Sequence, residues 1–356
     1  KGLEKAHLPS ENLFSASRQL VGDRMVYYRD RRNEYRFTMN ALMGLQKAKE
    51  QGNDIFLDPE ADFHLMAKRI HEMAHSPEDI AATLWTGRAI GTPIPQAAEA
   101  LFQSLLTAAP RLKNLSAKGL AWMIIACVTG DKKHVDRAGT LVKLAESKYI
   151  SDETKLVREH TAGIRRNWSS FGAHAYIAYA LLLYARRTGD GRAAGLGLQI
   201  VRKLVELQGD DGQWAWMYHV PTGKVADFYP VYSVHQYAYA PFFLLEAVDL
   251  GHSEFREPLV RGFRWILGNN EMKETMVEPK HHIVWRRVFR AGLNAKLVKI
   301  FRALAVIHFG VKADIEKPPA IQIDRQCWGF EMALPLLAFA GRKEFDELFC
   351  DQSFLS

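Results

Sequence analysis

Cysteine is scarce in this chain, with only three in 356 residues. Cys127, Cys327 and Cys350 show no CxxC spacing, so neither a disulfide framework nor a cysteine zinc site is expected. We therefore predict a reducing, cytoplasmic setting. Long hydrophobic runs are also missing, because none approaches the roughly 20 residues that a membrane-spanning helix requires. No membrane span is expected.

Motifs for nucleic acids are absent too. The sequence has no zinc-finger spacing, no RNP-type strand and no long basic run, so no nucleic-acid partner is expected. The 47 Lys and Arg exceed the 40 Asp and Glu only modestly, giving a net charge of +7. This small excess favours an anionic small molecule or an acidic glycan as partner. Nothing in the sequence indicates a cofactor or a resident metal, and the oligomeric state stays open.

Apolar residues recur at helical spacing along almost the whole chain. Segments starting near residues 36, 78, 116, 170, 232 and 325 are rich in Ala, Gly and aromatic residues and should be buried on nearly all sides. The segments between them, and the stretch 297–309, carry charges on one face. This alternation predicts an all-α fold, an α/α toroid of about six helical hairpins.

The toroid should form one domain over residues 1–356, with residues 1–34 as an N-terminal extension. Two stretches interrupt the helical pattern and predict short β-hairpins at one rim. One is residues 209–232, where aromatic residues alternate with others before a Pro-Thr-Gly turn. The other is residues 274–292. Loops at one rim of a rigid scaffold commonly hold binding residues.

The string LVELQGDDGQWAWMY contains a Q-x-x-D-G-x-W pattern from Gln208 to Trp214. This turn resembles that of six-hairpin α/α-toroid enzymes, namely unsaturated glycuronyl hydrolases, glucuronyl 5-epimerases and uronate lyases. In its QW form it also resembles terpenoid cyclases. The resemblance covers residues 160–270 well and the rest only by helical rhythm. It implies a carbohydrate-active enzyme, whereas the acid and diphosphate motifs of terpenoid cyclases are absent.

A glycan needs flat aromatic faces for its apolar ring surfaces and fixed polar groups for its hydroxyls. Side chains of these kinds lie in the first predicted hairpin and at the starts of three inner helices. The candidate substrate-binding residues are Trp214, Trp216, Tyr218, Tyr229, Gln236, Tyr239, Asn167, Arg286, Arg325 and Trp328. The alternative is that some of the aromatic residues, Tyr239 among them, simply pack the ring.

Proton abstraction beside a uronate carboxylate needs a cation, a base and an acid. The candidate catalytic residues are Tyr232, His235, His174 and Glu331. We expect Trp216, Tyr232, His235, His174 and Arg325 to line one pocket, with a rim position for His235. Arg286, Arg287 and Arg290 could add an anion clamp, although arginines on exposed strands also serve as solvated edge protection.

Glycoside hydrolysis is the neighbouring possibility and requires two carboxylates. The carboxylates nearest the expected site are Asp211, Asp227, Asp324 and Glu331. Asp211 also fits a turn residue, and Asp324 also fits a helix N-cap. The sequence does not select a pair.

His71-Glu72-Met73-Ala74-His75 matches the zinc-peptidase pattern H-E-x-x-H. Pro77 disfavours a helix at Ser76, and no third ligand follows in the expected spacing. We therefore expect His71 and His75 to be exposed and free of metal. A zinc peptidase is the weakest alternative; an isoprenoid-binding toroid and a non-catalytic protein that binds or helps assemble a glycan are the others.

Overall fold

The computed structural model describes residues 1–108, 115–292 and 313–348 and a few positions between 298 and 309. The helix expected at 297–309 lies partly outside these residues, and Cys350 lies wholly outside them. Cys127 and Cys327 are buried and free. In the described part of the chain, no helix combines the length and apolar character needed to cross a bilayer.

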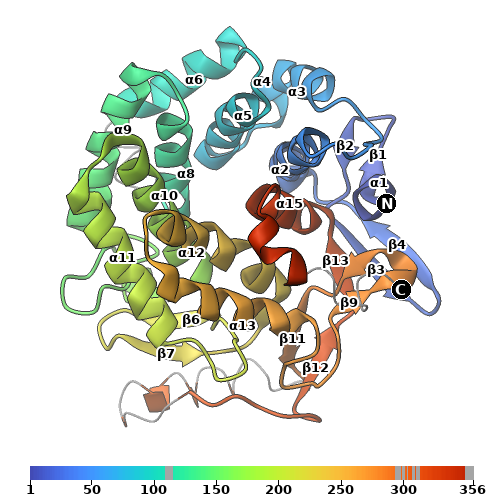
Figure 1. Ribbon diagram of the computed structural model, residues 1–356, viewed down its shortest axis with the longest axis vertical. Helices are drawn as coiled ribbons and strands as arrows, with labels where there is room; N and C mark the ends of the chain where they lie inside the picture. Colours follow the sequence, from blue (N-terminus) through green and yellow to red (C-terminus); the bar gives the residue numbers. More distant parts are fainter. Residues whose placement is uncertain are drawn as a thin grey trace.

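Six inner helical segments form a closed ring (Figure 1). They are α2 (Arg31–Glu50), α5 (Pro77–Ile90), α8 (Ala117–Val128), α10 (Phe171–Thr188), η3 with α12 (His235–Tyr239, Ala240–Asp249) and η6 with α15 (Gly329–Met332, Leu334–Phe339). Each segment packs against the next, and α15 returns to α2. The predicted toroid is confirmed.

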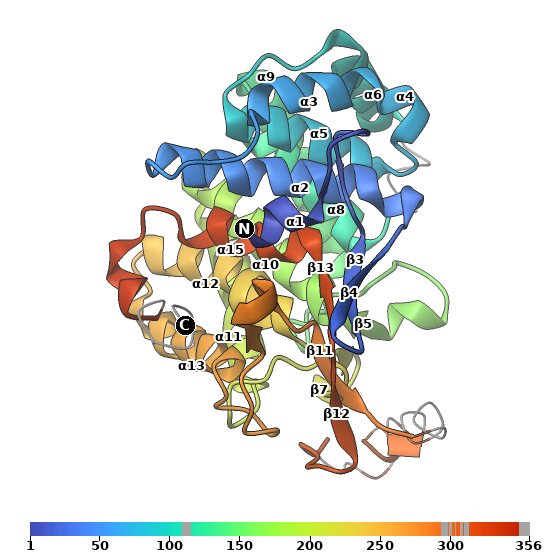
Figure 2. The same ribbon diagram turned by 90° about the vertical axis from the view of Figure 1, so that its right-hand side faces the viewer.

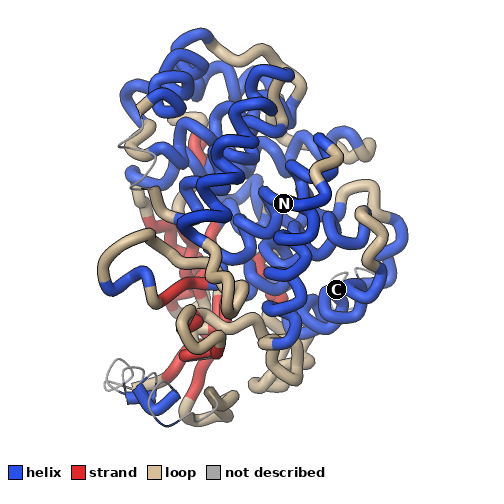
Figure 3. The backbone as a smooth tube through the Cα atoms, turned by 90° about the vertical axis from the view of Figure 1, so that its left-hand side faces the viewer, coloured by secondary structure: helices blue, strands red, loops and turns tan. Residues whose placement is uncertain are grey.

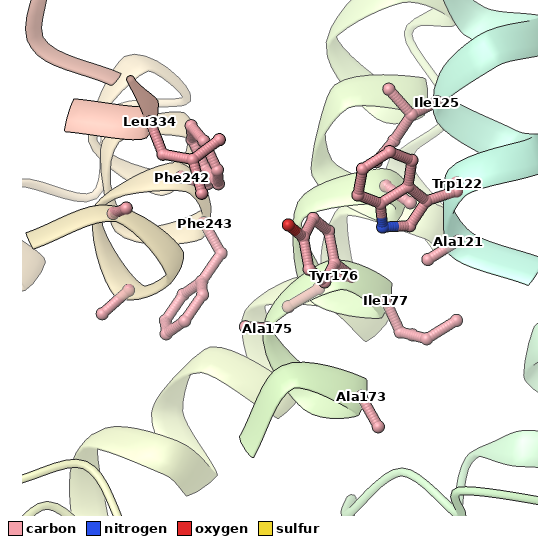
Figure 4. Packing of buried hydrophobic residues seen from close by; sticks show 14 of the residues in the cluster. Ala121, Trp122, Ile125, Ala173, Ala175, Tyr176, Ile177, Phe242, Phe243 and Leu334 are labelled. Atoms are coloured by element: carbon pink, nitrogen blue, oxygen red, sulfur yellow. The ribbon is translucent and has the colours of Figure 1, made fainter. Parts of the chain in front are cut away.

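The inner segments are buried because small and aromatic residues interlock between them. Figure 4 shows the Tyr176 ring of α10 next to Trp122 of α8, with its hydroxyl pointing toward the α12 side. The two ring centroids are 5.4 Å apart. Ser76 and Ser116 cap α5 and α8 by accepting backbone hydrogen bonds from Asp79 and Gly119.

Amphipathic helices form the outer layer. They are α3 (Pro59–Lys68), α6 (Gln96–Thr107), α9 (Lys132–Leu144), α11 (Gly191–Glu206) and α13 (Arg256–Ile266). Short helical turns join the elements at α1 (Gly2–Ala6), α4 (Ile70–Met73), η1 (Ala145–Tyr149), η2 (Ile164–Arg166), η4 (Ser253–Phe255), η5 (Pro279–His281) and η7 (Lys343–Leu348).

Most of the strands gather toward one end of the molecule (Figure 3). The three-stranded sheets are β5 (Trp168–Ser170), β6 (Met217–His219) and β7 (Lys224–Asp227); β12 (Ile321–Asp324), β11 (Arg287–Arg290) and β8 (Val231–Tyr232); and β13 (Gln326–Trp328), β3 (Ser17–Val21) and β4 (Arg24–Tyr28). The two-stranded pairs are β1 (His7–Leu8) with β2 (Leu13–Phe14), and β9 (Val277–Glu278) with β10 (Ile283–Val284).

Two boundaries differ from the sequence-based expectation. The hairpin expected over 274–292 contains only β9 and β10, because β11 pairs instead with β8 and β12. The last inner segment begins at Gly329 rather than near 325, because residues 326–328 are a strand. That strand, β13, pairs with β3, so the N-terminal extension is joined to the sixth inner segment.

Candidate functional site

The Q-x-x-D-G-x-W turn is held by hydrogen bonds between α11 and α13. The Gln208 side chain donates to the carbonyls of Gly212 and Pro258, each at 3.0 Å, and accepts from Arg261 at 2.7 Å. Gly212 has a φ of 97°, and a Cβ there would lie 2.4 Å from the Arg261 carbonyl oxygen. Glycine is therefore required, and the turn serves the fold.

Two predicted substrate-binding residues belong to this turn. Trp214 is fully buried and stacks against Phe171 at 5.4 Å between centroids. The buried Gln236 amide faces the Gly212 carbonyl at 3.0 Å and the Trp214 backbone nitrogen at 3.3 Å. Both side chains thus tie the turn to the inner helix and lie away from the surface.

Trp216, Tyr232 and His235 come together as predicted, where the β6–β7 hairpin meets the start of η3. The Trp216 ring lies 5.0 Å from Tyr232 and 6.0 Å from His235, and the last two rings are 5.2 Å apart. His235 is only 3% exposed, so its expected loosely packed rim position is wrong: Phe171 covers it at 4.7 Å.

Burial, together with the Lys118 ammonium, lowers the pKa of His235 to about 3. The imidazole is therefore neutral at physiological pH, and an anion bound beside it would raise its basicity. Its Nδ1 has no hydrogen-bond partner among the described residues. The ring also stacks on Tyr239 at 5.5 Å, and Tyr239 contacts Tyr176 at 5.0 Å.

Arg286 and Arg287 lie over the Tyr232 ring. The Arg286 guanidinium is 3.7 Å from the Trp328 ring centroid and 5.2 Å from that of Tyr232. It donates to the Gln326 side chain at 3.2 Å and makes no ion pair within the described residues. Arg287 donates to the Tyr232 hydroxyl at 3.1 Å and forms an ion pair with Asp324 at 2.8 Å.

Glu331 lies buried in η6, 3% exposed. Burial raises its pKa to about 8, although Arg286 and Arg287 act in the opposite direction. The side chain is consequently a neutral carboxylic acid at pH 7, and it leaves the charge of Arg286 uncompensated.

This raised pKa predicts a pH-dependent stability. Unfolded Glu331 releases its proton near pH 4.5, whereas folded Glu331 holds it to about 8, so stability falls as the pH rises through that window. Urea unfolding at about pH 5 and about pH 8.5 should show Glu331→Gln relieving roughly 3 kcal/mol of this loss. The exposed Glu72→Gln is the control. An equal pH response in wild type and Glu331→Gln would contradict the assignment.

Sequence reasoning missed four residues near Tyr239: Arg36, Asp79, Lys118 and Tyr176. Arg36 forms an ion pair with the buried Asp79 at 3.5 Å. Asp79 also accepts hydrogen bonds from Ser76 and the His75 backbone at 2.8 and 2.9 Å. A usable signal existed, since each residue lies in the first half of an inner helix, as His235 does.

Other predicted site residues lie elsewhere. His174 and Tyr218 are fully buried, and their ring centroids are 4.8 Å apart. The His174 Nδ1 is hydrogen-bonded to the Ser170 carbonyl. Asn167 and Arg325 are exposed, and Arg325 lies 5.9 Å over Trp285. The structure does not bring these four side chains to the Trp216–Tyr232–His235 cluster.

The third arginine of the suggested anion clamp is engaged inside the protein. Arg290 is buried and forms ion pairs with Asp227 at 2.7 Å and with Glu316. The Arg290 guanidinium lies over the Tyr229 ring, and the Tyr229 hydroxyl accepts a hydrogen bond from the Glu316 backbone. A clamp that includes Arg290 is therefore wrong, and Asp227 is not free for hydrolysis.

The zinc-like motif is interrupted as expected. His71 lies in α4, which ends at Met73, whereas His75 lies beyond it, and both side chains are exposed. No group of three or more metal-ligating side chains occurs in the described chain. The variant His71→Ala/His75→Ala should therefore keep the melting temperature and activity of the wild type within error. Stoichiometric zinc that disappears in this double variant would overturn that expectation.

A cavity of about 990 Å³ lies away from this cluster, between α2, α13, α15 and the β9–β10 hairpin. Its lining includes Leu45, Tyr237, Phe263, Met332 and Leu336. This lining is mainly aliphatic and contains none of the predicted catalytic residues. We therefore place the candidate site at the Trp216–Tyr232–His235 cluster, where neutral acid and base groups meet free cations.

Solved structures share this fold across nearly the whole chain. A sugar epimerase from a ruminal bacterium has a TM-score of 0.63 at 12% identity, covering 95% of each chain. The unsaturated glucuronyl hydrolase from Bacillus sp. GL1, described as responsible for glycosaminoglycan degradation, has a TM-score of 0.57 at 11% identity, covering 96% of this chain and 94% of that one. An unsaturated glucuronyl hydrolase specific for heparin has a TM-score of 0.55 at 11% identity, with coverages of 97% and 94%.

These similarities define the class of fold as a six-hairpin α/α toroid. This is the fold that the turn motif implied. No protein-family model matches the sequence, and no curated protein sequence matches it. At 10 to 12% identity the shared fold does not identify the reaction. The reaction therefore depends on which side chains meet at the candidate site.

Proposed function

We propose that this protein is a carbohydrate-active enzyme that acts on an acidic, uronate-containing glycan by acid–base chemistry. One observation carries the proposal. Arg286, a cation without an ion pair among the described residues, contacts the rings of Trp328 and Tyr232, and the neutral His235 lies 5.2 Å from the Tyr232 ring. A cation that can bind a carboxylate, aromatic rings that can stack on a sugar and a neutral imidazole thus lie close together.

The charges of the site favour an anionic ligand. Arg36 forms an ion pair with Asp79, and Arg287 forms one with Asp324. Lys118, whose side chain lies beside Gly172 and Tyr239, has no ion pair in the described chain, and neither has Arg286. Because Glu331 is neutral at pH 7, the site keeps an excess of positive charge.

In the proposed chemistry, Arg286 binds the uronate carboxylate through two N–H donors. Neutralising the carboxylate makes the adjacent C–H more acidic, and His235 accepts that proton. Tyr232, polarised by Arg287, then gives a proton either to the opposite face of the carbon or to the departing glycosidic oxygen. The first outcome is epimerisation, and the second is elimination, in which the C–O bond breaks and a C=C bond forms.

Hydrolysis is a second candidate, favoured by two carboxyl groups in different states. Glu331 is protonated at neutral pH, whereas Asp79 is ion-paired with Arg36. A glycosidase needs one carboxylic acid and one carboxylate, and these two side chains are the candidates for those roles. The names of the fold neighbours, an epimerase and glucuronyl hydrolases, support the general substrate class without choosing between these reactions.

A screen of heparosan, oligogalacturonate and alginate oligosaccharides would test the proposal. Three readouts separate the reactions when they are combined. Absorbance of a new double bond together with new reducing ends marks elimination, new reducing ends alone mark hydrolysis, and solvent deuterium at the sugar carbon without either marks epimerisation. We expect one of these patterns with a uronate and none with the matched neutral glycan. Binding without turnover would support the non-catalytic alternative, and binding of prenyl diphosphates alone would support the isoprenoid alternative. The cytoplasmic location stays a prediction.

A further inference from the structure

The sheet of β13, β3 and β4 leads from the candidate site to open surface. Trp328 at the end of β13 is opposite Ser17 of β3, and Ser17 is opposite Tyr28 of β4. Directly opposed residues of antiparallel strands point to the same face of a sheet. Trp328, Ser17 and Tyr28 therefore form one row on the face that Arg286 covers.

The neighbouring row on this face carries two side-chain amides. It consists of Gln326, Gln19 and the apolar Val26. The Gln326 side chain already accepts hydrogen bonds from Arg286 and from the Trp328 indole, at 3.2 and 3.1 Å. Gln19 is half-buried, so its amide is held by the sheet yet reachable. Aromatic faces beside fixed amides are what sugar rings and hydroxyls require.

Exposure increases along these rows away from the site. Ser17 is 5% exposed, whereas Tyr28 is 44% exposed and Val26 is 38% exposed. Ser17 is covered between the two aromatic residues, so Tyr28 and Val26 are the exposed ends of these rows. With two strand spacings between them, Trp328 and Tyr28 are about 10 Å apart, a span comparable with a disaccharide. Figure 2 shows the β3–β4 hairpin lying alongside β13.

We propose that this face, the β13–β3–β4 platform, binds sugar units of an acidic oligosaccharide beyond the unit held at Arg286. This inference rests on the proposed function and specifies its substrate as a chain longer than a disaccharide. The continuity of the Trp328–Ser17–Tyr28 row with the site favours a glycan over a second copy of the protein. The β4 edge begins with the charged Arg24, a feature that opposes edge-to-edge pairing.

The strand itself supplies a matched control for the test. Tyr27 is 48% exposed, but it is opposite Arg18, in the row of Cys327 on the other face. Isothermal titration calorimetry would compare a disaccharide and a hexasaccharide of heparosan, oligogalacturonate and alginate. We expect Tyr28→Ala to weaken hexasaccharide binding by about five-fold and to leave disaccharide binding unchanged. Tyr27→Ala should change neither, and Tyr28→Trp should restore hexasaccharide binding.

The outcomes separate this inference from the function on which it rests. If the wild type binds hexasaccharide no better than disaccharide, or if Tyr28→Ala and Tyr27→Ala behave alike, the platform is rejected and the proposed function stands. If the wild type binds no uronate glycan of either length, both fail. A fall in sedimenting mass with Tyr28→Ala would show that β4 joins two copies, which would also overturn the platform.

Discussion

Replacing Arg286 by methionine should lower kcat/KM for a uronate substrate by about 100-fold or more, because a carboxylate then loses its charge-assisted hydrogen bonds in a partly desolvated place. Methionine keeps an unbranched stem but loses the guanidinium contact with Trp328, so the melting temperature is compared beside the kinetics. Steady-state kinetics with the uronate substrate and with its methyl ester would measure the effect. The ester should lose much less.

Arg325→Met is the matched control for this experiment. Arg325 is exposed, lies close in sequence to the same sheet and stacks loosely on Trp285 at 5.9 Å. Its replacement should leave kcat/KM within about two-fold of the wild type. A large loss with Arg325→Met and a small one with Arg286→Met would transfer the carboxylate site to the residue that the sequence first suggested.

Replacing His235 by phenylalanine should lower kcat by about 10² to 10⁴-fold, the range typical of a lost general base. Phenylalanine keeps the ring contacts with Trp216, Phe171 and Tyr239, whereas alanine would leave a cavity and confuse loss of packing with loss of chemistry. The Nδ1 atom of His235 has no hydrogen-bond partner among the described residues. The melting temperature of His235→Phe should therefore equal or exceed that of the wild type.

His174→Phe provides the contrast. The imidazole of His174 is fully buried and bonds the Ser170 carbonyl through Nδ1 at 2.9 Å. Its replacement should lower the melting temperature and leave kcat nearly unchanged. Equal kinetic losses in the folded His174→Phe and His235→Phe proteins would contradict a catalytic role confined to His235.

The sequence predicted the fold well because helical periodicity and the alternation of small-residue and charged helices are local signals. Local signals also predicted that Trp216, Tyr232 and His235 lie near one another, because Trp216 precedes the β6–β7 hairpin and the other two residues follow it. The burial of His235 was not predictable, because Phe171 covers it from another helix. The different pairing of β11, the enclosure of Arg290 and the Arg36–Asp79 ion pair likewise depend on contacts distant in sequence.

The Q-x-x-D-G-x-W turn predicted the fold correctly but its residues do not form the candidate binding site. Its aromatic and polar residues looked suited to a glycan, yet Trp214 and Gln236 hold the turn that Gly212 and Gln208 build. Hydrogen-bonding residue types next to an inner helix therefore do not distinguish a ligand site from a buried joint. The distinction came from exposure and from the absence of an ion pair at Arg286 among the residues that the structure describes.

A crystal structure of His235→Phe with a bound uronate oligosaccharide would test the central claim most directly. We expect the carboxylate to lie within hydrogen-bond distance of Arg286, and a sugar ring to lie against Trp328 or Trp216. The carbon next to the carboxylate should face residue 235. A glycan bound with its carboxylate away from Arg286, or bound only in the cavity between α2 and α13, would contradict the account.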